Sequence, residues 1–283
     1  MAAKLTAPAV RAGKGGRPLV MVTAYDYPGA RIADEAGVDL ILVGDSLAQV
    51  VLGYDSTLHV TVDEMAHHVA AVARAKPDAL VVADLPWLSY HVSAEDTVRN
   101  GATLIRAGAQ AVKLEGGVRR VAMVEALLGA EIPVMGHIGL TPQSVLAMGG
   151  YRVQGRKLDE AAALIDDARA LADAGCFSIV LEGIPQEVAR RITAAVPVPT
   201  IGIGAGRSCD GQVLVLHDLL GLEDRIAPRF VRRYASLKET AVDAVSAFAA
   251  DVRSGRFPNE DESYHLAGGR SDPAPGEPES RTA

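Results

Sequence analysis

The sequence predicts a single-domain (β/α)8 TIM barrel, and three observations support this fold class. Short apolar runs alternate with longer segments of helical periodicity, which is typical of a parallel sheet whose strands are connected by helices. The runs number eight, as in a closed barrel of this kind. The chain has 283 residues, of which 49% are hydrophobic, so it can fill one large core.

The eight apolar runs are the predicted strands, and capping signals mark the helices between them. The runs lie at residues 19–23, 40–43, 80–83, 111–114, 133–136, 178–181, 200–202 and 212–216. Thr61 and Ser93 can cap the N-termini of the helical segments that follow them. Gly37, Gly108 and Gly175 each fall between a helical segment and the next strand, where a left-handed C-terminal cap is expected.

Two segments fall outside this alternation of strands and helices. Residues 1–14 are an N-terminal extension, residues 15–266 carry the catalytic barrel, and residues 267–283 are a tail. The tail ends in GGRSDPAPGEPESRTA, which has too few apolar side chains to offset the entropy of ordering, so we expect it to be disordered. The helical stretch near 231–253 is expected either to close the outer ring of the barrel or to join a subunit interface.

The charge and the cysteine content exclude several classes of protein. The formal net charge is −7 and no dense Lys/Arg stripe is present, which argues against binding to nucleic acid or to an anionic membrane. Cys176 and Cys209 are too few for a disulfide framework, which indicates a reducing compartment. No stretch approaches the roughly 18 to 20 apolar residues of a membrane span, and no signal peptide is evident. We expect a soluble, cytoplasmic protein.

Charged residues stand at the C-terminal ends of the predicted strands, where the active sites of such barrels lie. Asp45 follows the second strand, Asp84 the third, Glu115 the fourth and Glu182 the sixth. Lys113 points to the same side of the fourth strand as Glu115, because successive side chains of a strand alternate. Four carboxylates and a lysine are therefore expected to converge on one rim.

Carboxylates gathered in one mouth repel each other unless a positive group lies among them, and a hard divalent cation is the usual solution. Ligands that are all oxygen favour Mg²⁺ over Zn²⁺, and a 2-oxo acid adds two oxygens from its carboxylate and ketone. Lys113 would then stabilise a developing enolate. The alternatives are a helix cap or surface charge for each carboxylate and a structural ion pair for Lys113. His137, after the fifth strand, has either a structural role or a hydrogen bond to substrate.

Eight motifs stand out along the chain: GDS at 44–46, LGYDSTLHVTVDEM at 52–65, DLPWLSY at 84–90, VKLEGG at 112–117, PVMGHIGLTPQSV at 133–145, GGYRVQGR at 149–156, LEGIP at 181–185 and PTIGIGAGRSCDGQVLVLHDLLG at 199–221. They resemble the motifs of the 3-methyl-2-oxobutanoate hydroxymethyltransferase (ketopantoate hydroxymethyltransferase) family. Together they follow the order of the family over most of the chain, which is a highly specific signal. The departures are Ala48, Gln49 and His59, none of which is a catalytic position.

The resemblance implies an enzyme that uses Mg²⁺ and 5,10-methylenetetrahydrofolate. It would convert 3-methyl-2-oxobutanoate into 2-dehydropantoate in pantothenate biosynthesis, as a homodecamer of two pentameric rings. The implied roles are metal binding for Asp45, Asp84 and Glu115, substrate binding for Asp45, Ser46, Asp84 and Lys113, and proton acceptance for the catalytic Glu182.

Three other functions remain open. A Mg²⁺-dependent C–C lyase of the isocitrate lyase and phosphoenolpyruvate mutase type also has acidic residues on a barrel rim, although the reactive cysteine motif of that group is missing. A Schiff-base aldolase would use Lys113 as its nucleophile. A catalytically silent barrel that only binds a ligand or a partner is the alternative outside enzymes.

Overall fold

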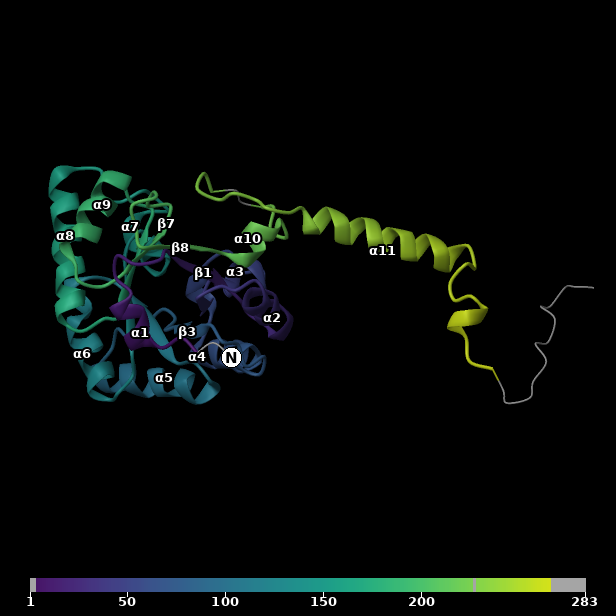
Figure 1. Ribbon diagram of the computed structural model, residues 1–283, viewed down its shortest axis with the longest axis horizontal. Helices are drawn as coiled ribbons and strands as arrows, with labels where there is room; N and C mark the ends of the chain where they lie inside the picture. Colours follow the sequence, from purple (N-terminus) through teal and green to yellow (C-terminus); the bar gives the residue numbers. More distant parts are fainter. Residues whose placement is uncertain (1–3, 226–227, 266–283) are drawn as a thin grey trace, which may run out of the picture. The chain divides into compact units, whose positions relative to one another are not determined.

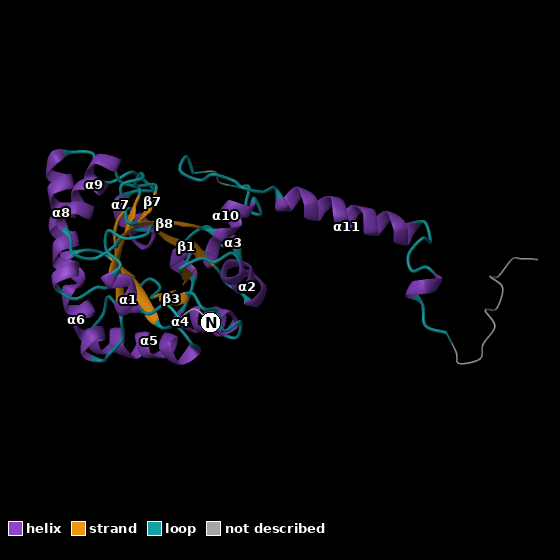
Figure 2. Cartoon of the chain, viewed as in Figure 1, coloured by secondary structure: helices purple, strands orange, loops and turns teal. Residues whose placement is uncertain are grey.

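Figure 1 shows the protein as a computed structural model, which describes residues 4–225 and 228–265. Eight parallel strands form a closed barrel in chain order, in which β8 pairs with β1. Figure 2 shows the strands in orange with helices around them. The predicted (β/α)8 barrel is therefore confirmed. The tail predicted at 267–283 lies outside the described residues.

The strands agree with the eight predicted runs and differ from them at the ends. They are β1 (Leu19–Thr23), β2 (Leu40–Val43), β3 (Leu80–Asp84), β4 (Ala111–Glu115), β5 (Val134–Gly139), β6 (Ser178–Glu182), β7 (Thr200–Ile203) and β8 (Gly211–Leu214). Asp84, Glu115 and Glu182 are the last residues of their strands. The predicted ends are wrong for β5, which extends to Gly139, and for β8, which stops at Leu214.

A helix of two turns or more follows each of the first six strands. These helices are α2 (Tyr27–Glu35), α4 (Val62–Ala73), α5 (Ala94–Ala107), α6 (Val121–Gly129), α8 (Leu158–Asp173) and α9 (Gln186–Ala195). Shorter elements are α1 (Ala7–Ala12), α3 (Leu47–Val50), α7 (Val145–Met148) and α10 (Leu216–Leu220), and the 3-10 helices η1 (Thr57–His59), η2 (Val118–Arg120) and η3 (Pro142–Ser144). The short elements lie before β1 or in loops after strands, so several of them border the C-terminal rim.

The predicted helix caps are confirmed. The hydroxyl of Thr61 accepts a backbone hydrogen bond at the start of α4, and Ser93 does the same for α5. Gly37, Gly108 and Gly175 have φ angles of 74°, 116° and 106°, in the left-handed region that glycine tolerates. The local sequence therefore starts and stops these elements where the barrel requires it.

Apolar side chains form one layer inside the barrel and another between the strands and the helices. The strand β4 shows the alternation: Ala111 belongs to the inner layer, whereas Val112 and Leu114 belong to the outer layer. Lys113 and Glu115 share the inward side with Ala111, because side chains alternate along a strand. The predicted common orientation of these two charged residues is confirmed.

The N-terminal segment closes the barrel at the end opposite to the predicted site. Ala7 and Val10 of α1 are buried in the inner apolar layer. Lys14 Nζ lies 2.8 Å from Asp210 Oδ2, just before β8, and donates to the carbonyl of Thr193 at 2.7 Å. With this end filled, the chemistry is left to the C-terminal ends of the strands.

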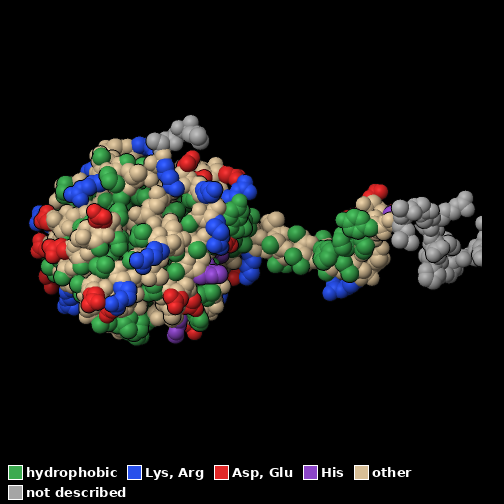
Figure 3. Space-filling model, turned by 90° about the horizontal axis from the view of Figure 1, so that it is seen from below, with side chains coloured by type: hydrophobic (Ala, Val, Ile, Leu, Met, Phe, Trp, Pro, Cys, Tyr) green, Lys and Arg blue, Asp and Glu red, His purple; other side chains and the backbone are tan. Residues whose placement is uncertain are grey.

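A second compact unit begins at Ser236. It contains α11 (Leu237–Arg253) and the 3-10 helix η4 (Glu260–Glu262). No residue of α11 is buried, and the Phe248 ring lies 5.1 Å from the Phe257 ring. The exposed apolar side chains of α11, green in Figure 3, include Val242, Val245, Phe248 and Val252. In the part of the chain that the structure describes, no helix is long and apolar enough to cross a membrane.

Candidate active site

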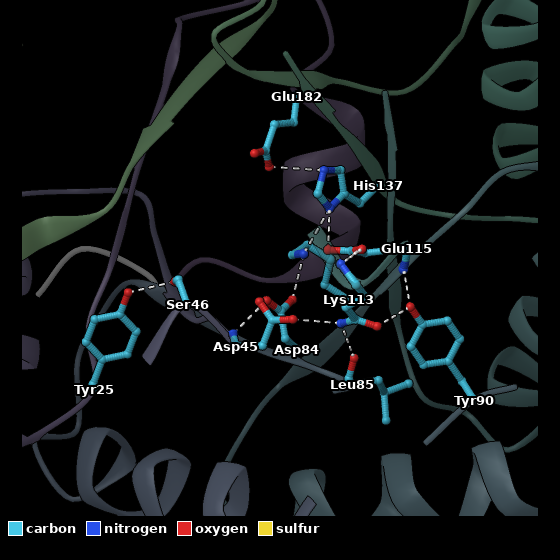
Figure 4. A network of polar contacts seen from close by, with 11 residues as sticks. Tyr25, Asp45, Ser46, Asp84, Leu85, Tyr90, Lys113, Glu115, His137 and Glu182 are labelled. Atoms are coloured by element: carbon cyan, nitrogen blue, oxygen red, sulfur yellow. Dashed lines mark hydrogen bonds and ion pairs between the residues drawn. The ribbon is translucent and has the colours of Figure 1, made fainter. Parts of the chain in front are cut away.

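The six predicted site residues come from the C-terminal ends of four strands (Figure 4). Asp45 and Ser46 follow β2, Asp84 ends β3, Lys113 and Glu115 lie in β4, and Glu182 ends β6. Relative exposure is 5% for Asp45, 2% for Asp84, 4% for Lys113 and 4% for Glu115. The side chain of Glu182 is 16% exposed, which leaves it the most accessible of the four carboxylates.

Asp84 is held between the end of β2 and the side chain of Lys113. The backbone N–H of Asp45 donates to Asp84 Oδ2 at 3.0 Å, and Lys113 Nζ lies 2.8 Å from Asp84 Oδ1. The residue before Asp45 is Gly44, where an added Cβ would stand 3.0 Å from Ser46 Oγ and 3.5 Å from Asp84 Oδ2. The glycine therefore leaves room for the Ser46 hydroxyl, whereas the distance to Asp84 is an ordinary van der Waals contact.

His137 lies between two of the carboxylates and close to the lysine. Its Nδ1 is 3.4 Å from Glu115 Oε1 and 3.3 Å from Lys113 Nζ, and its Nε2 is 3.3 Å from Glu182 Oε2. Burial and the charge of Lys113 lower the pKa of His137, but the carboxylates of Glu115 and Glu182 outweigh them and raise that pKa to about 9. The two carboxylates that the ring faces therefore favour its protonated form.

Negative charge is in excess around Asp45 and Asp84. Burial raises the pKa of Asp45 well above its usual value, and the charges of Asp84 and Glu115 raise it further. Burial also raises the pKa of Asp84, although Lys113 opposes this rise. The pKa of Lys113 is itself raised, because the attraction of these carboxylates exceeds the opposing effect of burial. The cluster therefore keeps Lys113 as an ammonium and favours any further positive charge that enters it.

Gln143 and Tyr90 also belong to this network and were not predicted from the sequence. The side-chain amide of Gln143 donates to Asp45 Oδ2 at 2.8 Å, and its backbone N–H donates to Glu115 Oε2 at 3.0 Å. The Tyr90 hydroxyl donates to Gln143 Oε1 at 2.5 Å and accepts from the Glu115 backbone N–H at 3.2 Å. Both residues stand in loops within the quoted motifs. A neutral side chain beyond the end of a strand has no sequence pattern that predicts where it points.

Ser46 has a separate partner on the other side of the rim. Its Oγ lies 2.8 Å from the hydroxyl oxygen of Tyr25, just beyond β1, as Figure 4 shows. The backbone carbonyl of Tyr25 in turn lies 2.6 Å from His68 Nδ1 in α4. The serine hydroxyl is therefore oriented by the loop after β1.

Donor groups of the protein contact oxygens of the Asp45 and Asp84 carboxylates. Across residues 4–225 and 228–265, no group of three or more His, Cys, Asp or Glu side chains is gathered as around a bound metal ion. Gln143 occupies Asp45 Oδ2, and Lys113 stands against Asp84 Oδ1. Asp84 Oδ1 is nevertheless a buried oxygen that accepts no aligned hydrogen bond. Because the Lys113 ammonium lies 2.8 Å from this oxygen, an incoming cation would have to share Asp84 Oδ1 with it.

Solved structures with the same fold belong to several enzymes. Phosphoenolpyruvate phosphomutase from Streptomyces platensis subsp. rosaceus has a TM-score of 0.60 and 18% identity, covering 89% of this chain and 88% of that chain. 2,3-Dimethylmalate lyase, a member of the PEP mutase/isocitrate lyase superfamily, has a TM-score of 0.58 and 19% identity, covering 92% of both chains. At this identity the likeness shows the fold alone.

Curated proteins are similar at much higher identity. The 3-methyl-2-oxobutanoate hydroxymethyltransferase of Moorella thermoacetica is 58% identical over 263 residues, which are 92% of this chain and 98% of the relative. The protein of that name from Syntrophobacter fumaroxidans is 54% identical over 265 residues, 93% of this chain and 94% of the relative. A sequence model described as ketopantoate hydroxymethyltransferase matches residues 4–260. The chain therefore belongs to the ketopantoate hydroxymethyltransferase family.

Proposed function

We propose that this chain transfers a hydroxymethyl group from 5,10-methylenetetrahydrofolate to 3-methyl-2-oxobutanoate, which gives 2-dehydropantoate in pantothenate biosynthesis. Membership of the family supports the reaction. The observation that carries it in the structure is the position of Glu182, an accessible carboxylate beside a buried cluster of carboxylates and cations. This arrangement suits the removal of a proton from a bound anionic oxo acid.

Asp45, Asp84 and Glu115 would hold Mg²⁺. Two features of these side chains fit a cation: mutual repulsion contributes to the raised pKa of Asp45, and Asp84 Oδ1 accepts no aligned hydrogen bond. Bound there, Mg²⁺ would draw electron density from the ketone of the oxo acid and make its C3 proton more acidic. Oxygen ligands suit this hard cation.

Glu182 would accept the C3 proton, with His137 orienting it. Its side chain is 16% exposed, so it can touch a substrate that enters from the rim. His137 Nε2 lies 3.3 Å from Glu182 Oε2, close enough to attract the carboxylate although it makes no aligned hydrogen bond with it. Lys113 would stabilise the negative charge that develops on substrate oxygen, and Ser46 would donate its hydroxyl hydrogen to the substrate carboxylate.

The bond changes of the reaction balance with one water. The C3–H bond breaks as Glu182 takes the proton, and C3 then forms a bond to the methylene carbon carried by the folate. One C–N bond of the methylene group breaks in that step, and water then replaces the second folate nitrogen at this carbon and supplies the hydroxyl oxygen. The two folate nitrogens take up the proton from C3 and one proton of the water, so tetrahydrofolate leaves. The residues of the rim bind and orient the oxo acid and move this one proton, while the folate supplies the carbon.

The geometry argues against one of the two enzymatic alternatives, the Schiff-base aldolase. A Schiff base would need a neutral Lys113 amine, whereas Lys113 stands 2.8 Å from Asp84 with its pKa raised. A C–C lyase would cleave its substrate without folate.

We also propose a homodecamer in the cytoplasm, as the family resemblance implies, and light scattering of the purified full chain tests that assembly.

A turnover assay tests the proposed reaction. The purified full chain is supplied with 3-methyl-2-oxobutanoate and 5,10-methylenetetrahydrofolate, and 2-dehydropantoate is measured by mass spectrometry. We expect product only when both substrates are present, and loss of product when a chelator removes divalent cations. Turnover of the oxo acid without folate would favour a lyase, and full activity in chelator would remove Mg²⁺ from the mechanism.

A further inference from the structure

Gln143 connects three strand ends around the candidate site. It lies in η3 beyond β5 and is 4% exposed. Its side-chain Nε2 donates to Asp45 Oδ2 at 2.8 Å and to the backbone carbonyl of Leu85 at 3.0 Å. Its backbone N–H donates to Glu115 Oε2 at 3.0 Å. A single buried residue therefore contacts the segments that follow β2 and β3 and the last residue of β4.

Tyr90 fixes which way the Gln143 amide points. The Tyr90 hydroxyl accepts from the Glu115 backbone N–H at 3.2 Å, so its own hydrogen is free to go to Gln143 Oε1, 2.5 Å away. With Oε1 used in this way, Nε2 must face Asp45 Oδ2 and the Leu85 carbonyl, both of which are acceptors. If the amide were flipped, Gln143 Oε1 would face the oxygens of Asp45 and Leu85, where no hydrogen bond could form. Only one orientation of the amide therefore satisfies all of its hydrogen-bond partners.

We propose that Gln143 is a positioning residue, which fixes the carboxylates of Asp45 and Glu115 for the cation that the proposed function requires. Donors from Gln143 hold Asp45 Oδ2 and Glu115 Oε2, so Asp45 Oδ1 is not engaged by these donors, and Glu115 Oε1 faces His137 Nδ1 at 3.4 Å. The inference rests on the proposed function, because it assigns these two residues as ligands. Tyr90 acts one step further out, by holding the amide.

The neutral amide suits this task better than a charged donor. Two buried carboxylates repel each other and rotate apart unless something holds them. A lysine or arginine would hold them but would also supply the positive charge that the ion brings. Mg²⁺ tolerates little deviation from octahedral geometry, so the orientation of each ligand oxygen affects its binding. Gln143 orients the oxygens and leaves their negative charge in place.

Three variants test the role of Gln143. Gln143→Met keeps the length of the side chain and removes its donors and acceptor, and Tyr90→Phe removes only the hydroxyl. Gln154→Met is the matched control, since Gln154 lies in the same loop after β5 and donates to the Arg152 carbonyl outside the network. Each full-length protein is stripped of metal, and its dissociation constant for Mn²⁺ is measured by electron paramagnetic resonance. Thermal unfolding and the KM and kcat for the oxo acid are measured in parallel.

We expect Gln143→Met to weaken Mn²⁺ binding by about 10- to 100-fold, the range typical when a partner of a metal ligand is removed. Tyr90→Phe should weaken it by a smaller factor, and Gln154→Met should leave it unchanged. At saturating Mn²⁺, much of the lost kcat should return, because excess metal compensates for a misplaced ligand. A merely structural residue would lower the unfolding temperature without this metal dependence.

The outcomes separate this inference from the proposed function. Equal Mn²⁺ binding by the wild-type protein, Gln143→Met and Tyr90→Phe would overturn the positioning role and leave the proposed reaction standing. Failure of the wild-type protein to bind Mn²⁺ would overturn both the role and the metal in the mechanism. If Gln143→Met does not fold, Tyr90→Phe decides alone, and an unchanged dissociation constant in that variant overturns the inference.

Discussion

Replacement of Lys113 by methionine tests whether buried charge holds the site together. Lys113 is 4% exposed, and its Nζ lies 2.8 Å from Asp84 Oδ1. Two unit charges 2.8 Å apart attract by about 6 kcal/mol at an effective dielectric constant of about 20. Desolvation offsets part of that energy, and removal of one partner from a buried pair costs about 3–5 kcal/mol. We expect Lys113→Met to lower the free energy of unfolding by that amount.

The assay is urea denaturation of the metal-free protein at neutral pH, at one fixed protein concentration because assembly adds to apparent stability. The double variant Asp84→Asn/Lys113→Met should recover most of the loss, since the carboxylate that Lys113 contacts directly then carries no charge. The control is Lys157→Met: Lys157 is 77% exposed and pairs with Glu160 at 3.4 Å, so its loss should cost at most about 1 kcal/mol. A loss no larger than that control, or additive effects in the double variant, would refute the electrostatic argument.

Three further variants probe the reaction, the closed end of the barrel and a helix cap. Glu182→Gln should retain oxo-acid binding but slow exchange of the C3 proton into deuterated water by about 10²- to 10⁴-fold, and exchange at the normal rate by NMR would remove Glu182 from its role. Burial raises the pKa of Asp210, but Lys14 and neighbouring donors outweigh it and lower that pKa. Asp210 therefore stabilises the fold above its unfolded pKa of about 3.9, and this stability is lost as pH falls through the lower folded value. The stability difference between wild type and Asp210→Asn should shrink over that acid range, and a difference independent of pH would contradict the assignment. Gly108→Ala should lower the unfolding temperature more than Gly37→Ala. A Cβ at Gly108 would stand 2.4 Å from the Cβ of Ala73, whereas a Cβ at Gly37 would have no other atom within 4 Å. Equal shifts in the unfolding temperature would contradict this steric argument.

The strands were predictable because the apolar pattern that marks them is local in the sequence. Their ends were harder to predict because they depend on pairing with neighbouring strands, which are distant in the sequence. Every predicted run became a strand. The run ending at residue 136 stopped short of Gly139, since Ile138 and Gly139 continue to pair with β6. The run ending at residue 216 was too long, because Val215 leaves the sheet to precede α10. Apolar letters alone do not distinguish the last residue of a strand from the first of a helix.

The charged part of the site was predictable for a physical reason. Parallel strands of a barrel end on one rim, so acidic residues at several strand ends had to approach one another. Alternation along β4 placed Lys113 and Glu115 on the same side, which the structure confirms. The contacts of His137 with Glu115 and Glu182 were left open, because they depend on how far β5 extends past its neighbours. The metal-binding and catalytic roles of these residues stay predictions.

Gln143 and Tyr90 show why the remaining part of the site could not be predicted. Their positions are set by loops after β5 and β3, whose conformations depend on tertiary contacts rather than on periodicity. Their chemistry is neutral, so no argument from charge repulsion points to them. Strand ends thus supply the ionised groups of this rim, and loops supply the neutral donors that orient those groups. Substitution of Gln143 or Tyr90 should therefore change how the site responds to a divalent cation even where every charged residue is intact.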